Sequence, residues 1–187
     1  LSKNWMSFFI PPMVPQMAKI LFGQGTFFES MRWERERGLK IALMPKSGGE
    51  PILLEEEACL AGHVIGAKEV GDELIVDLCR LAEWSCMGDA AANFRTSDWG
   101  GYGTGTIQRY RIDTKMRAVR SEQLCDIPGD FPRVDWRRES VGNRFGYFAA
   151  NTRPGEGGWF RGALKLDLES GATDLFELVS PGAVQAR

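Results

Sequence analysis

The stretch of sequence that decides the fold runs from Gly62 to Arg80 and reads GHVIGAKEVGDELIVDLCR. It contains two segments with the composition of β-strands, His63–Lys68 and Leu74–Leu78, and the second is the stronger of the two. An acidic turn, Glu69–Glu73, lies between them and contains a glycine. The stretch therefore predicts a strand, a turn and a returning strand.

The same stretch holds His63, the only histidine among the 187 residues. Zinc and iron sites in proteins need three or four protein ligands, so one histidine cannot build such a site alone. Two interpretations follow. His63 is either an ordinary core or surface histidine, or one ligand of a larger protein that supplies the others.

Short strand patterns separated by Gly, Pro, Asn and Asp continue along the chain, which is typical of an all-β protein. Further strands are predicted at Trp5–Ile10, Leu39–Met44, Gly105–Ile112, Arg144–Ala150 and Ala163–Asp167. Helical periodicity is weak: Met17–Phe22 predicts about one turn, and Ala82–Phe94 is ambiguous.

A faint internal repeat supports one all-β architecture. Tyr110–Asp113 and Leu164–Asp167 lie 54 residues apart, and each reads as a strand ending in Asp. Returning strands are predicted at Ala118–Leu124 and Ala172–Leu178, and Gly171 suits the positive φ of a tight turn. A hairpin recurring at about 50 residues is typical of a β-propeller blade. Unrelated hairpins share this pattern, so the repeat alone does not decide the architecture. As a function, a kelch-like interaction module remains open.

Composition excludes some classes of partner. The formal net charge is −2, from 23 basic and 25 acidic residues, which gives no attraction to nucleic acid. The apolar stretch Trp5–Phe22 is interrupted by Pro11, Pro12 and Pro15 and carries Lys19, so it does not predict a membrane-spanning helix.

The cysteines form no CxxC pair and have no histidines at zinc-finger spacing, which argues against a metal bound through sulfur. They are Cys59, Cys79, Cys86 and Cys125. Four are too few for a disulfide scaffold in a chain of this size. We expect free, mostly buried thiols, as in a protein of a reducing compartment such as the cytoplasm.

Four segments, in order across nearly the whole chain, resemble motifs of the carotenoid cleavage oxygenases, the iron(II) family that includes the retinal-pigment-epithelium isomerase and lignostilbene dioxygenases. They are Met31–Lys46, His63–Asp77, Asp130–Asp135 together with Arg144–Tyr147, and Phe160–Gly171. The resemblance implies an all-β fold, part of a seven-bladed β-propeller with iron on its axis. It also implies that residues 1–187 form a single partial domain, roughly the middle blades, truncated at both ends.

By this resemblance His63 is one of four histidines that hold iron(II), and the other three lie outside the chain. Asp130 falls where the family has a carboxylate that accepts the outer N–H of a ligand histidine. No separate catalytic side chain is assigned. The implied activity is oxidative cleavage, with dioxygen, of a conjugated double bond in a carotenoid or apocarotenoid. There are two alternatives: cleavage of a stilbene-type double bond, and a non-catalytic propeller that binds an apolar ligand or partner. The fragment alone is expected to be inactive.

The chain departs from the family pattern around both residues. Gly62, Gly66 and Lys68 stand where the family has Phe, Asn and an aromatic residue, and Asp130 is one methylene shorter than the usual glutamate. The shorter side chain leaves open whether it reaches a histidine. In the other interpretation, Asp130 is a loop carboxylate before a turn at Phe131 and Pro132.

The apolar segment Trp5–Phe28 has two interpretations of its own. Its Phe, Met and Ile content suits a peripheral membrane contact or a tunnel for a lipid-like substrate, properties that the family resemblance implies. Plain core packing between blades is the alternative. The expected location is therefore the cytoplasm, either free or peripherally bound to a membrane.

Overall fold

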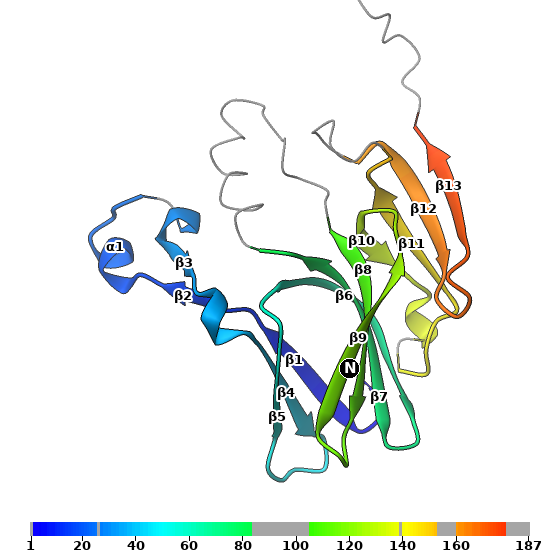
Figure 1. Cartoon of the computed structure of the whole chain (residues 1–187), viewed down its shortest axis with the longest axis horizontal. Helices are drawn as coiled ribbons and strands as arrows, with labels where there is room; N and C mark the ends of the chain where they lie inside the picture. Colours follow the sequence, from blue (N-terminus) through cyan, green and yellow to red (C-terminus); the bar gives the residue numbers. More distant parts are fainter. Residues whose placement is uncertain (1, 26, 84–104, 139, 153–159, 179–187) are drawn as a thin grey trace, which may run out of the picture.

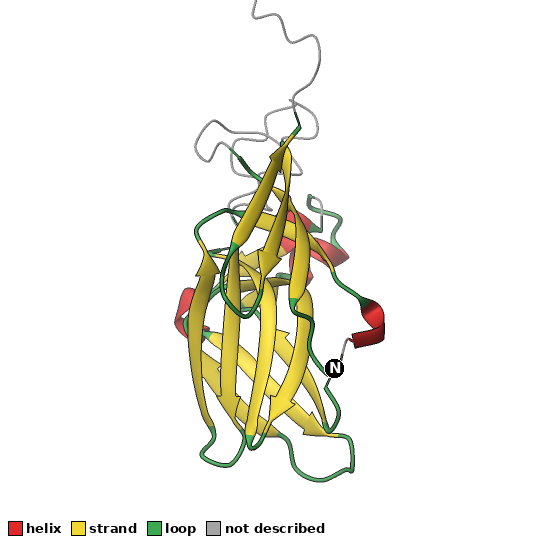
Figure 2. Ribbon diagram, turned by 90° about the vertical axis from the view of Figure 1, so that its right-hand side faces the viewer, coloured by secondary structure: helices red, strands yellow, loops and turns green. Residues whose placement is uncertain are grey.

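Nearly all of the regular secondary structure in the described chain is β-strand, as Figure 2 shows. The computed structural model describes residues 2–25, 27–83, 105–138, 140–152 and 160–178. Three antiparallel sheets lie next to one another, with a small arm beside the first (Figure 1). In the described part of the chain, no helix is long and apolar enough to cross a membrane.

The second and third sheets are meanders in which consecutive strands pair, whereas in the first sheet β1 pairs with β4. The first sheet has the order β1 (Trp5–Ile10), β4 (Leu39–Pro45), β5 (Ile52–Glu56). The second has the order β6 (Leu60–Val70), β7 (Glu73–Leu81), β8 (Thr106–Asp113), β9 (Ala118–Cys125). The third has the order β10 (Gly129–Arg133), β11 (Phe145–Ala150), β12 (Gly162–Asp167), β13 (Thr173–Glu177). Successive four-stranded meanders of this kind are the blades of a β-propeller.

The arm leaves the first sheet between β1 and β4 (Figure 1). It consists of the strand pair β2 (Met13–Pro15) and β3 (Met31–Trp33), the short helix α1 (Met17–Leu21), and two 3₁₀ turns, η1 (Phe28–Ser30) and η2 (Arg35–Arg37). A third 3₁₀ turn, η3 (Trp136–Arg138), lies between β10 and β11. The single helical turn predicted from Met17 is confirmed.

Two apolar cores hold the three sheets together. One joins the first sheet to the second and contains Leu39, Ile41, Val76 and Tyr110, among others. The other joins the second sheet to the third and contains Cys79, Ile107, Phe148, Leu164 and Leu166, among others. The second sheet is therefore covered on both faces, which explains why β7 reads as a nearly continuous apolar run.

The predicted repeat is confirmed as two equivalent hairpins, β8–β9 and β12–β13. Asp113 Oδ1 accepts the backbone N–H groups of Lys115 and Met116, at 2.9 and 2.7 Å. Asp167 Oδ1 accepts the corresponding groups of Glu169 and Ser170, at 2.9 and 3.3 Å. Each carboxylate thus satisfies the backbone of its own turn, which is why Asp recurs at the strand end.

The predicted strands are all present, with ends that shift by a few residues. Four strands were not predicted: β2, β3, β5 and β10. Strand β10 contains Pro132, a residue that normally demotes a strand, and it is irregular there. The ambiguous segment Ala82–Phe94 lies almost wholly outside the described residues.

The described cysteines are free thiols, as predicted. Cys59 and Cys79 are buried and Cys125 is partly buried. Cys86 lies outside the described residues.

Candidate functional site

His63 lies on β6, at the edge of the second sheet that faces the neighbouring sheets. Strand β6 contacts both β10, the first strand of the third sheet, and β1, the first strand of the first sheet. The pairing of β6 with β7 shifts register between Ala61 and Val64 and again between Val64 and Gly66. His63 therefore sits in a β-bulge, a feature that re-aims side chains and is common beside active sites.

Asp130 on β10 meets His63 across the boundary between two sheets. His63 Nδ1 lies 2.8 Å from Asp130 Oδ1. The carboxylate is mostly buried, with 17% of its side chain exposed, whereas the imidazole is 54% exposed. The structure thus brings together the two residues that the sequence singled out, and an aspartate is long enough for the contact.

The hydrogen bond fixes how His63 can act. Asp130 Oδ1 also accepts the backbone N–H of Phe131 at 2.7 Å, so this oxygen acts as an acceptor. An ionised Asp130 can only accept, so with that carboxylate the hydrogen of this contact is on His63 Nδ1 and the Nε2 lone pair is free. Within the described residues, Nε2 has no hydrogen-bond partner. A histidine held by a carboxylate through one nitrogen, with the other free, is the usual arrangement of a metal ligand.

The donor set fits iron in kind but supplies only one ligand. In the described part of the chain, no group of three or more His, Cys, Asp and Glu side chains could hold a metal ion. A neutral imidazole is a suitable ligand for iron. His63 therefore fits a metal centre whose other ligands come from outside the described residues.

One further ring contacts His63 and a second ring packs behind it, and neither contact was predicted. The Phe131 ring lies 5.1 Å from the His63 ring, and Phe160 packs edge-on against Phe131 at 5.6 Å. On the buried side, burial first and the Asp130 carboxylate next raise the pKa of the Cys79 thiol, which stays protonated. The sequence signal for Phe131 was its place beside Asp130, but nothing in the sequence indicated its contact with a histidine 68 residues earlier.

The departures around His63 have local reasons. A side chain at position 62 would place its Cβ 3.0 Å from the Cys79 carbonyl oxygen, a tight contact that glycine avoids. Lys68 packs its aliphatic stem against Gly142, where an added Cβ would meet Lys68 Cδ at 2.6 Å. The lysine is thus accommodated by a glycine in the loop that leads into β11.

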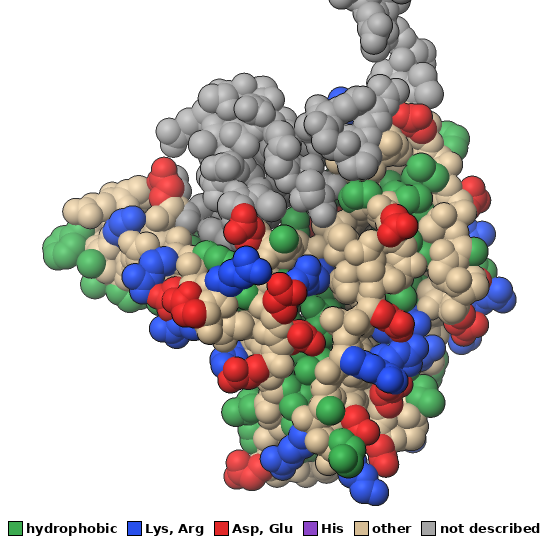
Figure 3. All heavy atoms as spheres, viewed as in Figure 1, with side chains coloured by type: hydrophobic (Ala, Val, Ile, Leu, Met, Phe, Trp, Pro, Cys, Tyr) green, Lys and Arg blue, Asp and Glu red, His purple; other side chains and the backbone are tan. Residues whose placement is uncertain are grey.

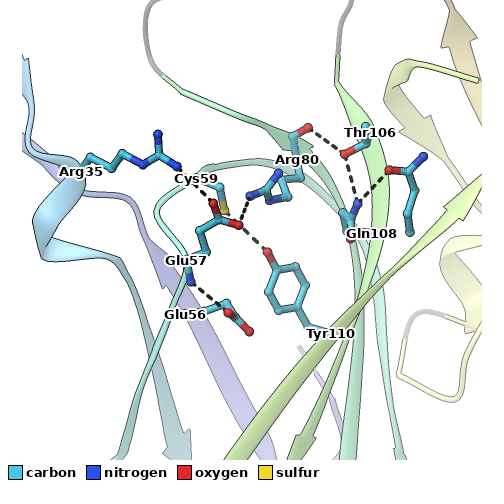
Figure 4. A network of polar contacts seen from close by, with 9 residues as sticks. Arg35, Glu56, Glu57, Cys59, Arg80, Thr106, Gln108 and Tyr110 are labelled. Carbon is cyan, nitrogen blue, oxygen red and sulfur yellow. Dashed lines mark hydrogen bonds and ion pairs between the residues drawn. The ribbon is translucent and has the colours of Figure 1, made fainter. Parts of the chain in front are cut away.

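A second polar cluster lies between the first and second sheets (Figure 4). The Glu57 carboxylate lies between Arg35 of η2 and Arg80 of β7, at 3.3 and 3.4 Å. Next to it, the Cys59 thiol lies 3.6 Å from the Tyr110 hydroxyl. Burial first, and then Cys59, raise the pKa of Tyr110, so the phenol stays protonated. These contacts link the arm to the second sheet and supply no free acid or base.

The fold and the His63–Asp130 pair together define the class of protein. It is a set of β-propeller blades that present an exposed histidine, oriented by a carboxylate, at the edge where the blades meet. The family described as retinal pigment epithelial membrane protein matches residues 1–185. The chain belongs to this family, which is the carotenoid oxygenase family that the four motifs predicted.

Two curated relatives illustrate the range of the family. The apocarotenoid-15,15'-oxygenase of Synechocystis sp. is 26% identical over 158 residues, covering 83% of this chain and 31% of that enzyme. The isoeugenol monooxygenase of Pseudomonas nitroreducens is 24% identical over 153 residues, covering 81% of this chain and 31% of that enzyme. The chain thus spans about a third of the length of either relative.

Solved structures agree on the fold. A cobalt-substituted Synechocystis apocarotenoid oxygenase superposes with a TM-score of 0.83 at 20% identity, covering 96% of this chain and 37% of that one. An ACO/RPE65 chimera gives a TM-score of 0.82 with the same identity and coverage. The chain is therefore part of a β-propeller.

Proposed function

We propose that this chain is part of an iron(II)-dependent dioxygenase in which His63 binds the metal through Nε2 and Asp130 fixes the orientation of its ring. The observation that carries the proposal is the 2.8 Å contact between His63 Nδ1 and Asp130 Oδ1, which leaves Nε2 free on a half-exposed ring. The other ligands would come from the remainder of the complete protein. Bound iron(II) would supply the means of activating dioxygen.

The roles of the chain's own residues follow from their positions. Asp130 would hold the proton on Nδ1 and increase the basicity of Nε2. Because the side chain of Asp130 is largely buried, little water would compete with His63 for its oxygens. Phe131 and Phe160 would form an apolar wall beside His63, suited to a substrate with a flat, conjugated double bond.

We propose a carotenoid or apocarotenoid as the substrate, cleaved at a conjugated double bond to two carbonyl products. The match to an apocarotenoid oxygenase supports this choice. A stilbene-type or related aromatic alkene is the second candidate, supported by the match to an isoeugenol monooxygenase of nearly the same identity.

We also propose that the tip of the arm contacts a membrane, the source of an apolar substrate. None of the α1 residues is buried. Leu21, Phe22 and Phe27 are 75%, 77% and 61% exposed, and Figure 3 shows hydrophobic side chains gathered at this tip. Leu21→Ser with Phe22→Ser should then reduce sedimentation of the complete protein with phospholipid vesicles. Met116→Ser, a change at an equally exposed apolar side chain (75%) in the β8–β9 turn, should leave it unchanged.

The metal proposal is tested in the complete protein by iron analysis and by product chromatography with an apocarotenal and a stilbenoid as substrates. We expect His63→Ala to abolish iron retention and cleavage together, while circular dichroism still shows a β-fold. Full activity of His63→Ala would remove His63 from the site. A wild-type protein that retains no iron would favour the non-catalytic alternative.

A further inference from the structure

Phe131 has an unusual backbone for its residue type. Among the described residues, only Arg117 and Phe131 have positive φ without being glycine, and both have φ of 53°. Such a conformation is sterically unfavourable for a side chain with a Cβ. Phe131 also precedes Pro132, whose ring restricts the preceding residue further.

The two strained residues occupy different settings. Arg117 lies in the β8–β9 turn, 54 residues before Gly171, which has φ of 75° at the equivalent point of the β12–β13 turn. The geometry of that turn accounts for Arg117. Phe131 instead lies within strand β10, where the register shifts between Asp130 and Arg133. Strain at a bulge that holds a site residue is a pointer to function.

In this conformation, both the backbone N–H and the ring of Phe131 contact the His63–Asp130 pair. Its backbone N–H donates to Asp130 Oδ1 at 2.7 Å, the same oxygen that accepts from His63 Nδ1. Its ring lies 5.1 Å from the imidazole, tilted by 44°. Phe160, 5.6 Å away and nearly perpendicular, supports the Phe131 ring from another side. One residue therefore restrains the carboxylate and the histidine together.

We propose that Phe131 is a positioning residue for His63: its strained backbone is retained because it holds the Asp130 carboxylate and its ring fixes the plane of the imidazole. The proposal rests on the proposed role of His63 as a metal ligand. It adds Phe131 to the site as a residue that acts on His63 through its ring and on Asp130 through its backbone N–H. If the strain served only the path of the chain before Pro132, glycine would serve at least as well, because glycine adopts positive φ without a steric cost.

The test compares three changes at one position in the complete protein. Phe131→Gly removes the ring and relieves the backbone strain, whereas Phe131→Leu keeps a large apolar side chain without the flat ring. Phe131→Tyr keeps the ring and adds a hydroxyl, which solvent can accommodate because Phe131 is 41% exposed. Arg117→Gly is the matched control, because it relieves the same φ of 53° far from His63. Three quantities are measured: thermal stability, the rate at which iron(II) is lost to a chelator, and the imidazole ¹⁵N shifts of His63 in the metal-free protein.

We expect Phe131→Gly to lose iron about 10-fold faster, the low end of the range for partners of metal ligands. In the same variant we expect the Nδ1-protonated tautomer of His63 to be no longer the main form. We expect no fall in thermal stability. Phe131→Tyr should restore wild-type values, Phe131→Leu should fall between, and Arg117→Gly should leave both His63 readouts unchanged.

Unchanged iron loss and unchanged ¹⁵N shifts in Phe131→Gly would overturn the proposal. A parallel fall of stability and iron retention in Phe131→Gly would also overturn it, because that pattern indicates packing alone. If the wild-type protein retains no iron, the proposed function fails, yet the ¹⁵N shifts, assigned by their loss in His63→Ala, still decide whether Phe131 positions the ring.

Discussion

Asp130 Oδ1 lies 2.8 Å from His63 Nδ1 although 67 residues separate the two in sequence. The contact exists because β6 and β10, the first strands of two successive sheets, run against each other. An ion pair or hydrogen bond formed across a sheet boundary depends on how the sheets stack. The pair is therefore a product of the propeller arrangement.

The first prediction concerns the length and charge of Asp130 in the complete protein. Asp130→Asn keeps the shape but presents a neutral acceptor, so we expect iron retention or turnover to fall about 10- to 100-fold. Because Asp130 already reaches His63 and also accepts the Phe131 N–H, we expect Asp130→Glu to bring no gain. Iron content and turnover are the measurements. Wild-type values in Asp130→Asn would reduce Asp130 to a structural residue of β10.

The second prediction concerns the 187-residue chain by itself. It has one histidine, and its described part holds no cluster of three potential ligands. We therefore expect no tight iron(II) binding by calorimetry and no cleavage of either substrate class. Stoichiometric, tight binding by this chain would contradict the assignment of His63 as one ligand among several.

Sequence patterns were sufficient for the strands that alternate or are buried on both faces. Strand β7 was recognised from its apolar run, and the paired hairpins from Asp113 and Asp167, because a carboxylate that caps its own turn is a local device. Strand β10 was missed because its signals conflict. Pro132 cannot donate to a ladder, and the bulge around Phe131 breaks the alternation.

The candidate site could be named from the sequence only through the family resemblance. Spacing alone gives no reason to pair His63 with Asp130, since their contact arises from packing between sheets. The close approach of Gly62 to the Cys79 carbonyl and the contact of the Phe131 ring with His63 are likewise products of tertiary structure. Glycine at position 62 is a departure from the family pattern, and the structure shows that it avoids a tight contact with the Cys79 carbonyl oxygen.

The third prediction concerns the buried ion pair between β7 and β8. Arg109 donates to both carboxylate oxygens of Asp77, at 2.7 and 2.8 Å, and both side chains are nearly buried. Arg109→Met leaves the Asp77 charge buried without its partner, so we expect a loss of about 3–5 kcal/mol in unfolding free energy.

Denaturant or thermal unfolding of the complete protein measures this loss. Arg120→Met is the matched control, because Arg120 is 73% exposed in its pair with Glu73. Its removal should cost no more than about 1 kcal/mol. Equal losses in the two variants would show that the Asp77–Arg109 pair contributes nothing beyond an exposed pair.

The last prediction concerns the pH dependence of stability through Glu69, which ties the start of the chain to the end of β6. Ser2 Oγ donates to Glu69 Oε1 at 2.5 Å, and the backbone N–H and side-chain amide of Asn4 donate to its two oxygens at 2.7 Å each. Burial acts to raise the pKa of Glu69, but these hydrogen bonds outweigh it, and the pKa lies below its ordinary value. A carboxyl whose pKa is lowered by folding stabilises the folded state above the pKa of the unfolded chain, about 4.3.

That stabilisation is lost as the pH falls through the lowered folded value. Glu69→Gln should therefore unfold at a lower temperature than the wild type at neutral pH, and the difference should shrink as the pH drops below about 4.3. Glu50→Gln is the control, because Glu50 is exposed and makes no hydrogen bond or ion pair among the described residues. Thermal unfolding of the three proteins between pH 3 and pH 7 is the measurement. A gap between wild type and Glu69→Gln that stays constant over this range would show that the carboxylate charge of Glu69 does not stabilise the junction between Ser2, Asn4 and β6.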